Sequence, residues 1–298
     1  MEKKPLISII ILNYNQLKVT CEFLESAKQL TYPNYEIILV DNASEENPME
    51  YVSKNFPDVR VIVNDKNHGF TGGNNIGMKA AKGSFYFIVN NDTEIGGDLL
   101  EKLLEPFYED PDVGMVSPKI KFYHNPDTIQ YAGFTKVNPF TGRNRAVGSL
   151  EKDEGQHNTP GYTNYAHGAA MLVKQEVIDK VGMFPEHFFI YYEELDWSAH
   201  TRRAGFRIFY QPTAEILHKE SITMGKESAI KAYYHNRNRI LFMRRNSNTF
   251  EFSVFFLFLI FFTVPKNILK YTMKGQKEHR RNFVNALIWN LKSSKYNQ

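Results

Sequence analysis

The segment LISIIIL at positions 6–12 is an unbroken run of mostly β-branched apolar residues, and similar runs recur after it. These are EIILVD at 36–41, VRVIVN at 59–64 and FYFIVN at 85–90. The stretches between them space their apolar residues as helices do. Short apolar strands that alternate with helices are buried on both faces and form a parallel sheet with helices on either side. The sequence therefore predicts an α/β fold built on a mostly parallel sheet.

Polar residues end these predicted strands. They are Asn13, Asp41, Asn64 and Asn90, with Asp92 two residues further on. In an open α/β sheet the ligand binds at the carboxyl ends of the strands, which share one edge. We therefore expect these side chains to lie along one edge of the sheet, around a ligand.

The composition is that of a globular protein. The chain has 298 residues, 42% of them apolar and 23% charged, which suffices for one large domain or for one domain with a substantial appendage. The lone Cys21 excludes a disulfide framework and a multi-cysteine zinc site, and it fits a reducing compartment. The apolar run at 6–12 is too short for a secretory signal and leads into polar residues, so no such signal is expected.

The net charge of +3 conceals an asymmetry along the chain. From Lys231 onward there are 13 basic and 2 acidic residues, whereas the preceding 230 residues hold 23 basic and 31 acidic ones. A basic tail on an acidic body indicates an anionic partner that only the tail meets, such as phospholipid headgroups or nucleic acid.

The segment FSVFFLFLIFFTV at 252–264 is almost entirely apolar, and basic residues follow it closely. Thirteen helical residues span about 20 Å, less than the hydrocarbon core of about 30 Å, so we expect the segment to be too short to cross a bilayer. An apolar segment beside a basic one is typical of an interfacial anchor on an anionic leaflet. The alternative is a buried core helix with a solvated charged neighbour.

A glycine-rich segment, NHGFTGGNNIG at 67–77, leads into a helix expected near Asn74–Ala81. Glycines that open a helix allow backbone N–H groups and the helix dipole to face an anion. The segment matches neither a P-loop nor a dinucleotide-binding fingerprint, so a purely structural tight turn is an equal alternative.

Two single residues are candidates for metal binding. Asp92 follows a buried strand, where a carboxylate can hold Mg²⁺ or Mn²⁺ against a diphosphate, although an aspartate there also caps helices and turns. His218 follows a predicted strand that ends near Ile216-Leu217. A lone histidine in that setting more often has a structural hydrogen-bonding role.

The segment YYEELDW at 191–197 places Glu193, Glu194 and Asp196 at a probable helix start. They can act as surface charges that stabilise the helix dipole. The aromatic residues around them instead indicate partial burial, which raises the proton affinity of a carboxylate as a general base requires.

Taken together and in order, these segments resemble glycosyltransferase family 2, and most of all its bacterial rhamnosyltransferase-type branch, which builds surface polysaccharides. The segments that carry the resemblance are ISIIILNYN, EIILVDNAS, NHGFTGGNNIG, FYFIVNNDT, HGAAMLV, FFIYYEELDWSAHTRRAG, ILH and YYHNRNR, over about residues 5–245. The resemblance implies a GT-A fold, an inverting mechanism and a divalent metal, Mg²⁺ or Mn²⁺.

The resemblance also implies which residues contact the nucleotide-sugar donor. Asp41 is expected to hydrogen-bond the nucleotide base, and Asn13 and Asn15 to lie near the nucleotide. The full set implied to contact the donor is Asn13, Asn15, Asp41, Asn74, Asn75, Asn91 and Asp92.

For the metal, Asp92 matches the second aspartate of the family's Asp-x-Asp pattern, and His218 matches a histidine that can complete the metal shell. The first aspartate of the pattern is Asn90 in this chain, a departure that leaves fewer anionic ligands. For the base, the family's Glu-Asp motif corresponds to Glu193-Glu194. Glu194 is the first candidate for the catalytic base, and Asp196 is the alternative.

The implied reaction transfers rhamnose or another hexose from a UDP- or dTDP-sugar to a hydroxyl of a glycan or a polyprenyl-diphosphate-linked acceptor. We expect residues 1–248 to form the catalytic domain and residues 249–298 a helical tail on the anionic, cytoplasmic face of the cell membrane, with no nucleic-acid partner. The tail helices could equally pair two copies of the chain.

Three other functions are weighed against this one. A sugar nucleotidylyltransferase is disfavoured because its Gly-rich, Arg/Lys signature near the N-terminus is missing. A processive polysaccharide synthase is disfavoured because we expect no full transmembrane span and find no Gln-x-x-Arg-Trp motif. A catalytically degenerate, membrane-bound partner of another transferase is suggested by Asn90.

Overall fold

A computed structural model of the protein describes residues 4–219 and 228–293. Its centre is one sheet in which the strands follow the order β3-β2-β1-β4-β9-β6-β10-β5. The first four of these are β3 (Val59–Val63), β2 (Tyr35–Asp41), β1 (Ile7–Asn13) and β4 (Phe85–Val89), and neighbouring members pair in parallel. The α/β architecture predicted from these four runs is confirmed.

The second half of the sheet is mixed. It contains β9 (Ala170–Lys174), β6 (Val113–Phe122), β10 (Arg207–His218) and β5 (Thr93–Ile95). Strand β9 is antiparallel to both β4 and β6, whereas β6 and β10 are parallel to each other. Two further strands lie off this path, β7 (Asn125–Tyr131) beside β6 and β8 (Gly161–Tyr162) beside β10.

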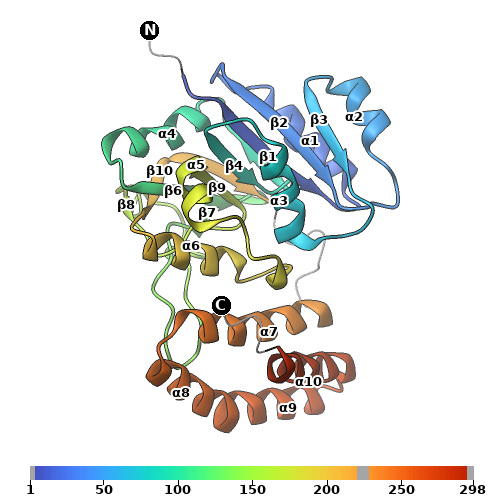
Figure 1. Ribbon diagram of the computed structural model, residues 1–298, viewed down its shortest axis with the longest axis vertical. Coiled ribbons are helices and arrows are strands. Elements are labelled where there is room, and N and C mark those ends of the chain that lie inside the picture. The colour runs from blue at the N-terminus through green and yellow to red at the C-terminus, as the bar shows by residue number, and fades with distance from the viewer. Residues whose placement is uncertain (1–3, 220–227, 294–298) are drawn as a thin grey trace.

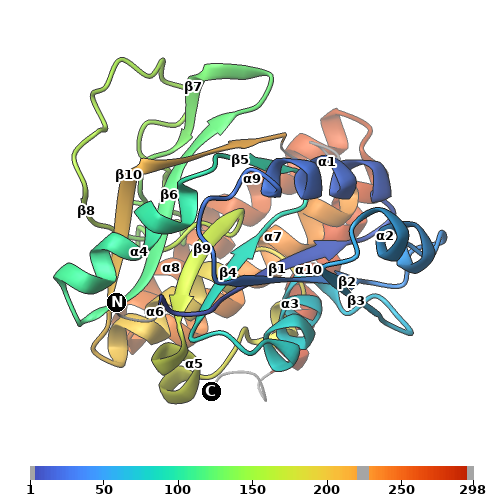
Figure 2. The same ribbon diagram turned by 90° about the horizontal axis from the view of Figure 1, so that it is seen from above.

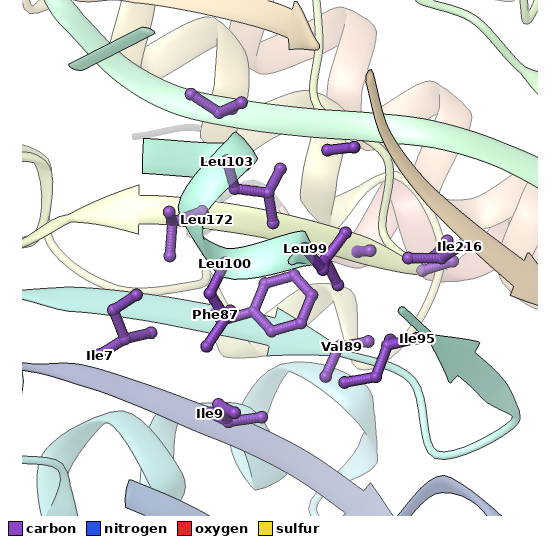
Figure 3. Close-up of a cluster of buried hydrophobic side chains, with 14 of the residues drawn as sticks. Ile7, Ile9, Phe87, Val89, Ile95, Leu99, Leu100, Leu103, Leu172 and Ile216 are labelled. Carbon is purple, nitrogen blue, oxygen red and sulfur yellow. The ribbon is translucent and has the colours of Figure 1, made fainter. Parts of the chain in front are cut away.

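Helices cover both faces of the sheet. The strands alternate their side chains between the two faces, so each face contributes to a core. Ile7, Ile9 and Ile11 of β1 point to one face and pack in a core with α1 (Leu17–Ala27) and α4 (Leu99–Glu109), part of which is drawn in Figure 3. Ile10 points to the other face, which α3 (Gly69–Ala80), α5 (Gln175–Val181) and α6 (Glu193–Arg203) cover. Helix α2 (Met49–Asn55) and the short η1 (Glu186–Phe188) complete the sheet domain.

Helix α3 begins at Gly69, five residues before the predicted start near Asn74. Its glycines allow the helix to lie against the sheet. A Cβ atom on Gly73 would come within 2.3 Å of Leu12 Cδ1, and one on Gly77 within 2.5 Å of Ile10 Cγ2. Gly73 and Gly77 therefore have no room for a side chain. From Gly69 onward, the glycine-rich segment lies within the helix rather than before it.

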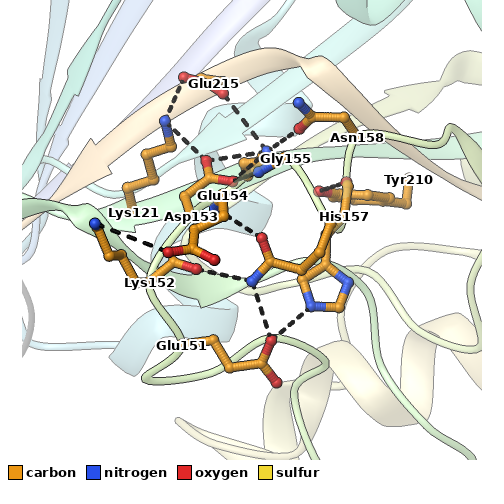
Figure 4. Close-up of polar contacts among 12 residues, drawn as sticks. Lys121, Glu151, Lys152, Asp153, Glu154, Gly155, His157, Asn158, Tyr210 and Glu215 are labelled. Atoms are coloured by element: carbon orange, nitrogen blue, oxygen red, sulfur yellow. Dashed lines mark hydrogen bonds and ion pairs between the residues drawn. The ribbon is translucent and has the colours of Figure 1, made fainter.

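A long excursion, residues 132–169, leaves the sheet after β7, and a buried ion-pair network holds it against β6 (Figure 4). Lys119 of β6 is fully buried, contacts Asn158, and pairs with Asp153 at 3.1 Å. Lys121 pairs with both Asp153 and Glu215, each at 3.0 Å. Despite its burial, hydrogen bonds from the two lysines lower the pKa of Asp153 to about 2. The excursion is thus fastened to β6 across a broad pH range.

The C-terminal helices form a separate layer below the sheet domain (Figure 1), and the view from above shows the sheet lying over them (Figure 2). They are α7 (Ala229–Asn246), α8 (Thr249–Phe258), a π-helical turn η2 (Leu259–Thr263), α9 (Val264–Met273) and α10 (Lys277–Lys292). Helix α7 joins the two parts. Its Arg237 side chain bonds the His187 carbonyl at 2.7 Å, while its Arg244 bonds the Asn290 carbonyl of α10 at 2.7 Å.

Helices α8 and α9 continue into each other and give one helical stretch, Thr249–Met273, of 25 residues. A capping box between Asn248 and Glu251 starts it, and Pro265 does not end it because the proline sits in the first turn of α9, just after the π-turn. At 1.5 Å per residue the stretch is about 37 Å long. The prediction that the apolar segment is too short to cross a bilayer was therefore wrong: by length and composition this helix can do so.

Candidate active site

The carboxyl ends of β1, β2 and β4 open into a cavity of about 410 Å³. Its walls come from these strand ends, from the start of α3, from the loops at 167–169 and 189–194, and from α7. The lining residues are Leu12, Tyr14, Asn42, Asn67, Gly69, Phe70, Asn90, Asn91, Asp92, Gln130, His167, Gly168, Ala169, Phe189, Ile190, Tyr191, Glu193, Glu194, His218, Lys231 and His235. The cavity thus lies at the sheet edge where the strand-ending residues predicted a ligand.

Asp92 and His218 meet in this cavity from different parts of the chain. Asp92 follows β4, His218 ends β10, and His218 Nε2 lies 3.1 Å from Asp92 Oδ1. On its other side, His218 Nδ1 lies 2.8 Å from Gln130 Oε1, an acceptor that can hold the proton on Nδ1; the Nε2 lone pair then faces Asp92. A carboxylate oxygen and a free imidazole nitrogen at this spacing fit two ligands of one divalent cation.

Asn90 stands beside this pair, with its amide nitrogen 3.5 Å from His218 Nε2, and Asn91 donates to Thr20 Oγ1 at 2.8 Å. The described residues contain no cluster of three or more His, Cys, Asp or Glu side chains able to hold a metal. A cation at Asp92 and His218 would therefore take its remaining ligands from elsewhere, for example from phosphate oxygens.

Asn13 and Asp41 face each other at the ends of β1 and β2, and both are fully buried. Asn13 donates to Asp41 Oδ1 at 2.7 Å, and Ser44 donates to the same carboxylate through its N–H at 2.9 Å and its hydroxyl at 2.6 Å. Asn15 accepts a 2.8 Å hydrogen bond from the Glu45 N–H. The residues that reach the cavity are their neighbours Tyr14 and Asn42, so the donor contacts expected of Asn13, Asn15 and Asp41 stay predictions.

Asn74 and Asn75 are buried within α3 rather than lining the cavity. Asn74 donates to the Phe70 carbonyl at 2.8 Å. Asn75 donates to the Phe184 carbonyl at 2.9 Å and accepts from the Phe184 N–H at 3.0 Å. In this structure they hold α3 and the 184–186 segment in place, and their contact with the donor also stays a prediction.

Glu193 and Glu194 begin α6 at the floor of the cavity. One carboxylate oxygen of each, Oε2, is buried without a hydrogen-bond partner among the described residues. Burial raises the pKa of Glu194 to about 7. Burial, together with the neighbouring Glu194 charge, raises the pKa of Glu193 well above its usual value. Glu194 therefore has the proton affinity that suits a general base near neutral pH.

The backbone at residues 189–192, before these glutamates, is strained, and a side chain of α7 holds it in place. Phe189, Tyr191 and Tyr192 have φ angles of 66°, 70° and 71°, which non-glycine residues rarely adopt. Asn238 of α7 donates to the carbonyls of Phe188, Ile190 and Tyr191 at 2.9, 2.7 and 2.7 Å. Such strain persists only where the surroundings enforce it, and it is concentrated at functional sites.

Asp196 points away from the cavity. Its carboxylate receives Arg245 Nε at 3.0 Å and Asn246 Nδ2 at 2.6 Å, and its side chain is 1% exposed. A carboxylate engaged in this way does not face the cavity, so the structure disfavours Asp196 as the base, and the role of Glu194 stays a prediction.

Several lining residues had no role assigned from the sequence. Tyr191 stacks on His235 of α7 with ring centroids 4.2 Å apart, and Lys231 lies over the same tyrosine ring. The segment YYHNRNR pointed to this part of α7, but which of its side chains face the cavity depends on how α7 packs against the sheet domain.

Comparison with known proteins bears directly on this site. The family model described as glycosyl transferase family 2 matches residues 8–182. The low-salt glycan biosynthesis hexosyltransferase Agl10 of Haloferax volcanii is 26% identical over 240 residues, covering 79% of this chain and 74% of the relative. The N-acetylglucosaminyl-diphospho-decaprenol L-rhamnosyltransferase of Mycobacterium tuberculosis is 24% identical over 244 residues, covering 74% and 78%.

Two solved structures share the fold. GalNAc-T7 with UDP, GalNAc and Mn²⁺ has a TM-score of 0.65 at 16% identity, covering 88% of this chain and 57% of that one. The mannosyltransferase PcManGT of Pyrobaculum calidifontis with GDP-Man and Mn²⁺ has a TM-score of 0.61 at 14% identity, covering 98% and 89%. The fold is therefore of the GT-A type, as the resemblance implied. Since the family model covers more than half of the chain, this protein is an enzyme that belongs to glycosyltransferase family 2.

Proposed function

We propose that this enzyme is an inverting, metal-dependent transferase that moves rhamnose or another hexose from a UDP- or dTDP-sugar to a hydroxyl group. The acceptor is a glycan or a polyprenyl-diphosphate-linked sugar in the synthesis of a cell-surface polysaccharide. One observation carries the proposal: the Asp92–His218 pair and the carboxylate of Glu194 line the same cavity.

In the proposed reaction, Glu194 accepts the proton of the acceptor hydroxyl as its oxygen attacks the anomeric carbon. The new bond joins this oxygen to the anomeric carbon, the bond from that carbon to the phosphate oxygen breaks, and the nucleoside diphosphate leaves with the bonding pair. A divalent cation on Asp92 and His218 would offset the charge that develops on the leaving diphosphate. A single carboxylate then suffices, because the leaving group needs no proton donor.

The substrate class is supported by the relatives. One is named as a hexosyltransferase of glycan biosynthesis, and another as a rhamnosyltransferase that acts on N-acetylglucosaminyl-diphospho-decaprenol. Both solved structures of this fold contain Mn²⁺ with a nucleotide or a nucleotide-sugar. These names favour Mn²⁺ or Mg²⁺ as the cofactor and a lipid-linked diphosphate as the anchor of the acceptor.

The C-terminal layer supports a peripheral position on the cytoplasmic face of the membrane. Phe255 and Leu259 pack inward beside α7 and are 1% and 2% exposed, whereas Phe261, Phe262 and Leu269 are 67%, 63% and 61% exposed. A helix packed along one side and apolar on the other can lie in the membrane interface, and the lysines of α9 suit an anionic leaflet. Pairing of two chains through this face is the competing outcome.

The test is thermal stabilisation by nucleoside diphosphates and nucleotide-sugars, with and without Mn²⁺ or Mg²⁺, because a ligand of the native state raises its melting temperature by mass action. A metal-dependent shift with UDP or dTDP, and a larger one with a single sugar conjugate, is the expected result. Release of free sugar from that donor then shows that the site is active. Donor binding without sugar release or transfer would instead favour the degenerate partner suggested by Asn90.

A further inference from the structure

A second cavity, of about 310 Å³, adjoins the first on the side of the C-terminal helices. Tyr191, Glu194 and His235 line both cavities, so the stacked Tyr191–His235 pair and the candidate base separate them. Beyond this shared wall the second cavity is lined by Arg143 from the 132–169 excursion and by Arg239 from α7.

The second cavity contains two arginines, and the one carboxylate in its lining is that of Glu194. Arg239 is 3% exposed, and its Nε is buried without a hydrogen-bond partner. Its one side-chain hydrogen bond among the described residues goes to the neutral Asn236 at 3.0 Å. No ion pair within residues 4–219 and 228–293 includes Arg239 or Arg143. The amide nitrogen of Asn144 is also buried without a partner.

The pKa values reflect this excess of positive charge. Burial lowers the pKa of Arg239 to about 10; Tyr192 opposes this lowering, and the nearby Arg143 contributes to it. Burial lowers the pKa of His235 to about 4, with added repulsion from Lys231, Arg143 and Arg239. Removing an unpaired guanidinium from water is unfavourable unless an anion and hydrogen-bond acceptors replace the water.

We propose that this second cavity binds the phosphate or diphosphate group of the acceptor, with Arg143 and Arg239 as its ligands. The inference rests on the function proposed above and adds the place where the acceptor is held. A guanidinium matches phosphate oxygens with paired hydrogen bonds, and Asn144 supplies a further donor. A sugar linked to a phosphate held there lies next to Glu194, on the opposite side of the Tyr191–His235 stack from Asp92 and His218.

The position of the cavity suits a lipid-linked acceptor. Gly142, which precedes Arg143, accepts a 3.0 Å hydrogen bond from the Tyr192 hydroxyl and packs near Phe255 of α8. The excursion that carries Arg143 is thereby held between the strained loop before Glu194 and the helix proposed to lie on the membrane. A lipid chain can leave the cavity toward α8 while its diphosphate stays on the arginines.

The test measures anion binding to the full chain by calorimetry in EDTA, so that metal chelation plays no part. UDP is present at a concentration that a prior titration shows to saturate the metal-free protein, so that the donor cavity is blocked. The two ligands are inorganic pyrophosphate and farnesyl diphosphate. Both are expected to bind to the wild type, and Arg143→Ala should weaken both by about tenfold or more. Arg145→Ala is the matched control, because Arg145 is an exposed arginine of the same excursion that does not line the cavity.

Arg239→Gln is the second variant and should weaken binding in the same way. The conclusion does not depend on whether it folds, since Arg143 is exposed and its truncation leaves the core intact. Equal pyrophosphate affinity in wild type and Arg143→Ala would overturn the proposal. Pyrophosphate binding that is seen without UDP and lost when UDP is added would also overturn it. Displacement of farnesyl diphosphate by vesicles of phosphatidylglycerol would assign the cavity to a lipid headgroup and also overturn it. Failure of the proposed function would be seen separately, as a wild-type enzyme that neither hydrolyses nor transfers sugar from any donor.

Discussion

His218, the last residue of β10, places its Nε2 atom 3.1 Å from Oδ1 of Asp92, which follows β4. The two residues are far apart in the chain, and the strand order brings them together at one edge of the sheet. If they share a divalent cation, Asp92→Asn should abolish the metal-dependent part of the thermal shift with UDP, and His218→Ala should reduce it. Asp65→Asn is the control, because this aspartate is 86% exposed. An unchanged metal-dependent shift in both site variants would place the metal elsewhere.

Glu194→Gln should lower the transfer rate by about 10²–10⁴-fold, the usual contribution of a general base, and leave UDP binding intact. Asp196→Asn should act differently, because it breaks the buried pair with Arg245. Loss of one partner of a buried ion pair costs about 3–5 kcal/mol of unfolding free energy. Single-turnover transfer, donor affinity and urea unfolding separate the two effects. A Glu194→Gln enzyme with near wild-type transfer would remove this residue as the base.

The rate of transfer should rise with pH through an apparent pKa of about 7, because Glu194 must be ionised to accept a proton and its burial raises its pKa to about 7. The measurement is a pH–rate profile from pH 5.5 to pH 8.5 under single-turnover conditions, in buffers of constant ionic strength. Glu194→Gln should lose this dependence along with its activity. A wild-type profile that is flat between about pH 6 and pH 8 would contradict the assignment.

The raised pKa of Glu194 also predicts how the stability of the protein changes with pH. The folded-state pKa of Glu194 is about 7 against the usual glutamate value of 4.5, so the folded state binds the proton more tightly than the unfolded state. The stability that comes from burying the neutral carboxyl is complete below the unfolded value and is lost as pH rises through about 7. Glu194→Gln should therefore raise the melting temperature at pH 8 and change it little at pH 4.5. A larger gain at the lower pH would reverse the sign and refute the buried-acid interpretation.

Asn238 holds the strained loop before Glu194 through three carbonyl hydrogen bonds. Asn238→Ala should destabilise the protein by at least about 1–3 kcal/mol, because it leaves buried carbonyls without donors. It should also lower the transfer rate more than donor affinity, because Glu194 loses its position. Ile230→Ala is the comparison on the same helix, since its side chain is 55% exposed and lines neither cavity. Equal effects of the two variants on rate would argue against a positioning role for Asn238.

Phe261→Glu with Phe262→Glu should abolish co-sedimentation with phosphatidylglycerol vesicles, because both rings are more than half exposed on the apolar side of the 249–273 helix. The control is Leu150→Glu, which removes an even more exposed apolar residue (77%) from the sheet domain. Sedimentation velocity of the same variants examines the competing outcome. If the wild type is a dimer that binds no lipid and the Phe261→Glu, Phe262→Glu variant is a monomer, this face is a contact between two chains.

Much of the sheet domain could be predicted from local patterns. The apolar runs revealed β1, β2, β3 and β4 as strands, and burial on both faces holds best for β1 and β4. Strand β3 lies at the edge of the sheet and has no buried residue, which the run itself did not show. The antiparallel insertion of β9 between β4 and β6 was not predictable in this way, because strand direction depends on partners far away in the chain. The helix at 249–273 was underestimated because only its apolar run at 252–264 was counted, whereas the helix continues through Pro265 after a π-turn.

By itself, the sequence determined the α/β class and predicted a ligand at the carboxyl ends of the strands, with Asp92 beside it, because an apolar run defines a strand and the polar residue after it lies at the carboxyl end. The candidates His218 and Glu194 came from the resemblance of the ordered segments to the family. Only the tertiary structure set Glu194 apart from Asp196, because it turns one toward a cavity and the other onto Arg245. The tertiary structure alone also brought Arg143 and Arg239 to one cavity, since their meeting depends on how α7 packs beneath the sheet domain.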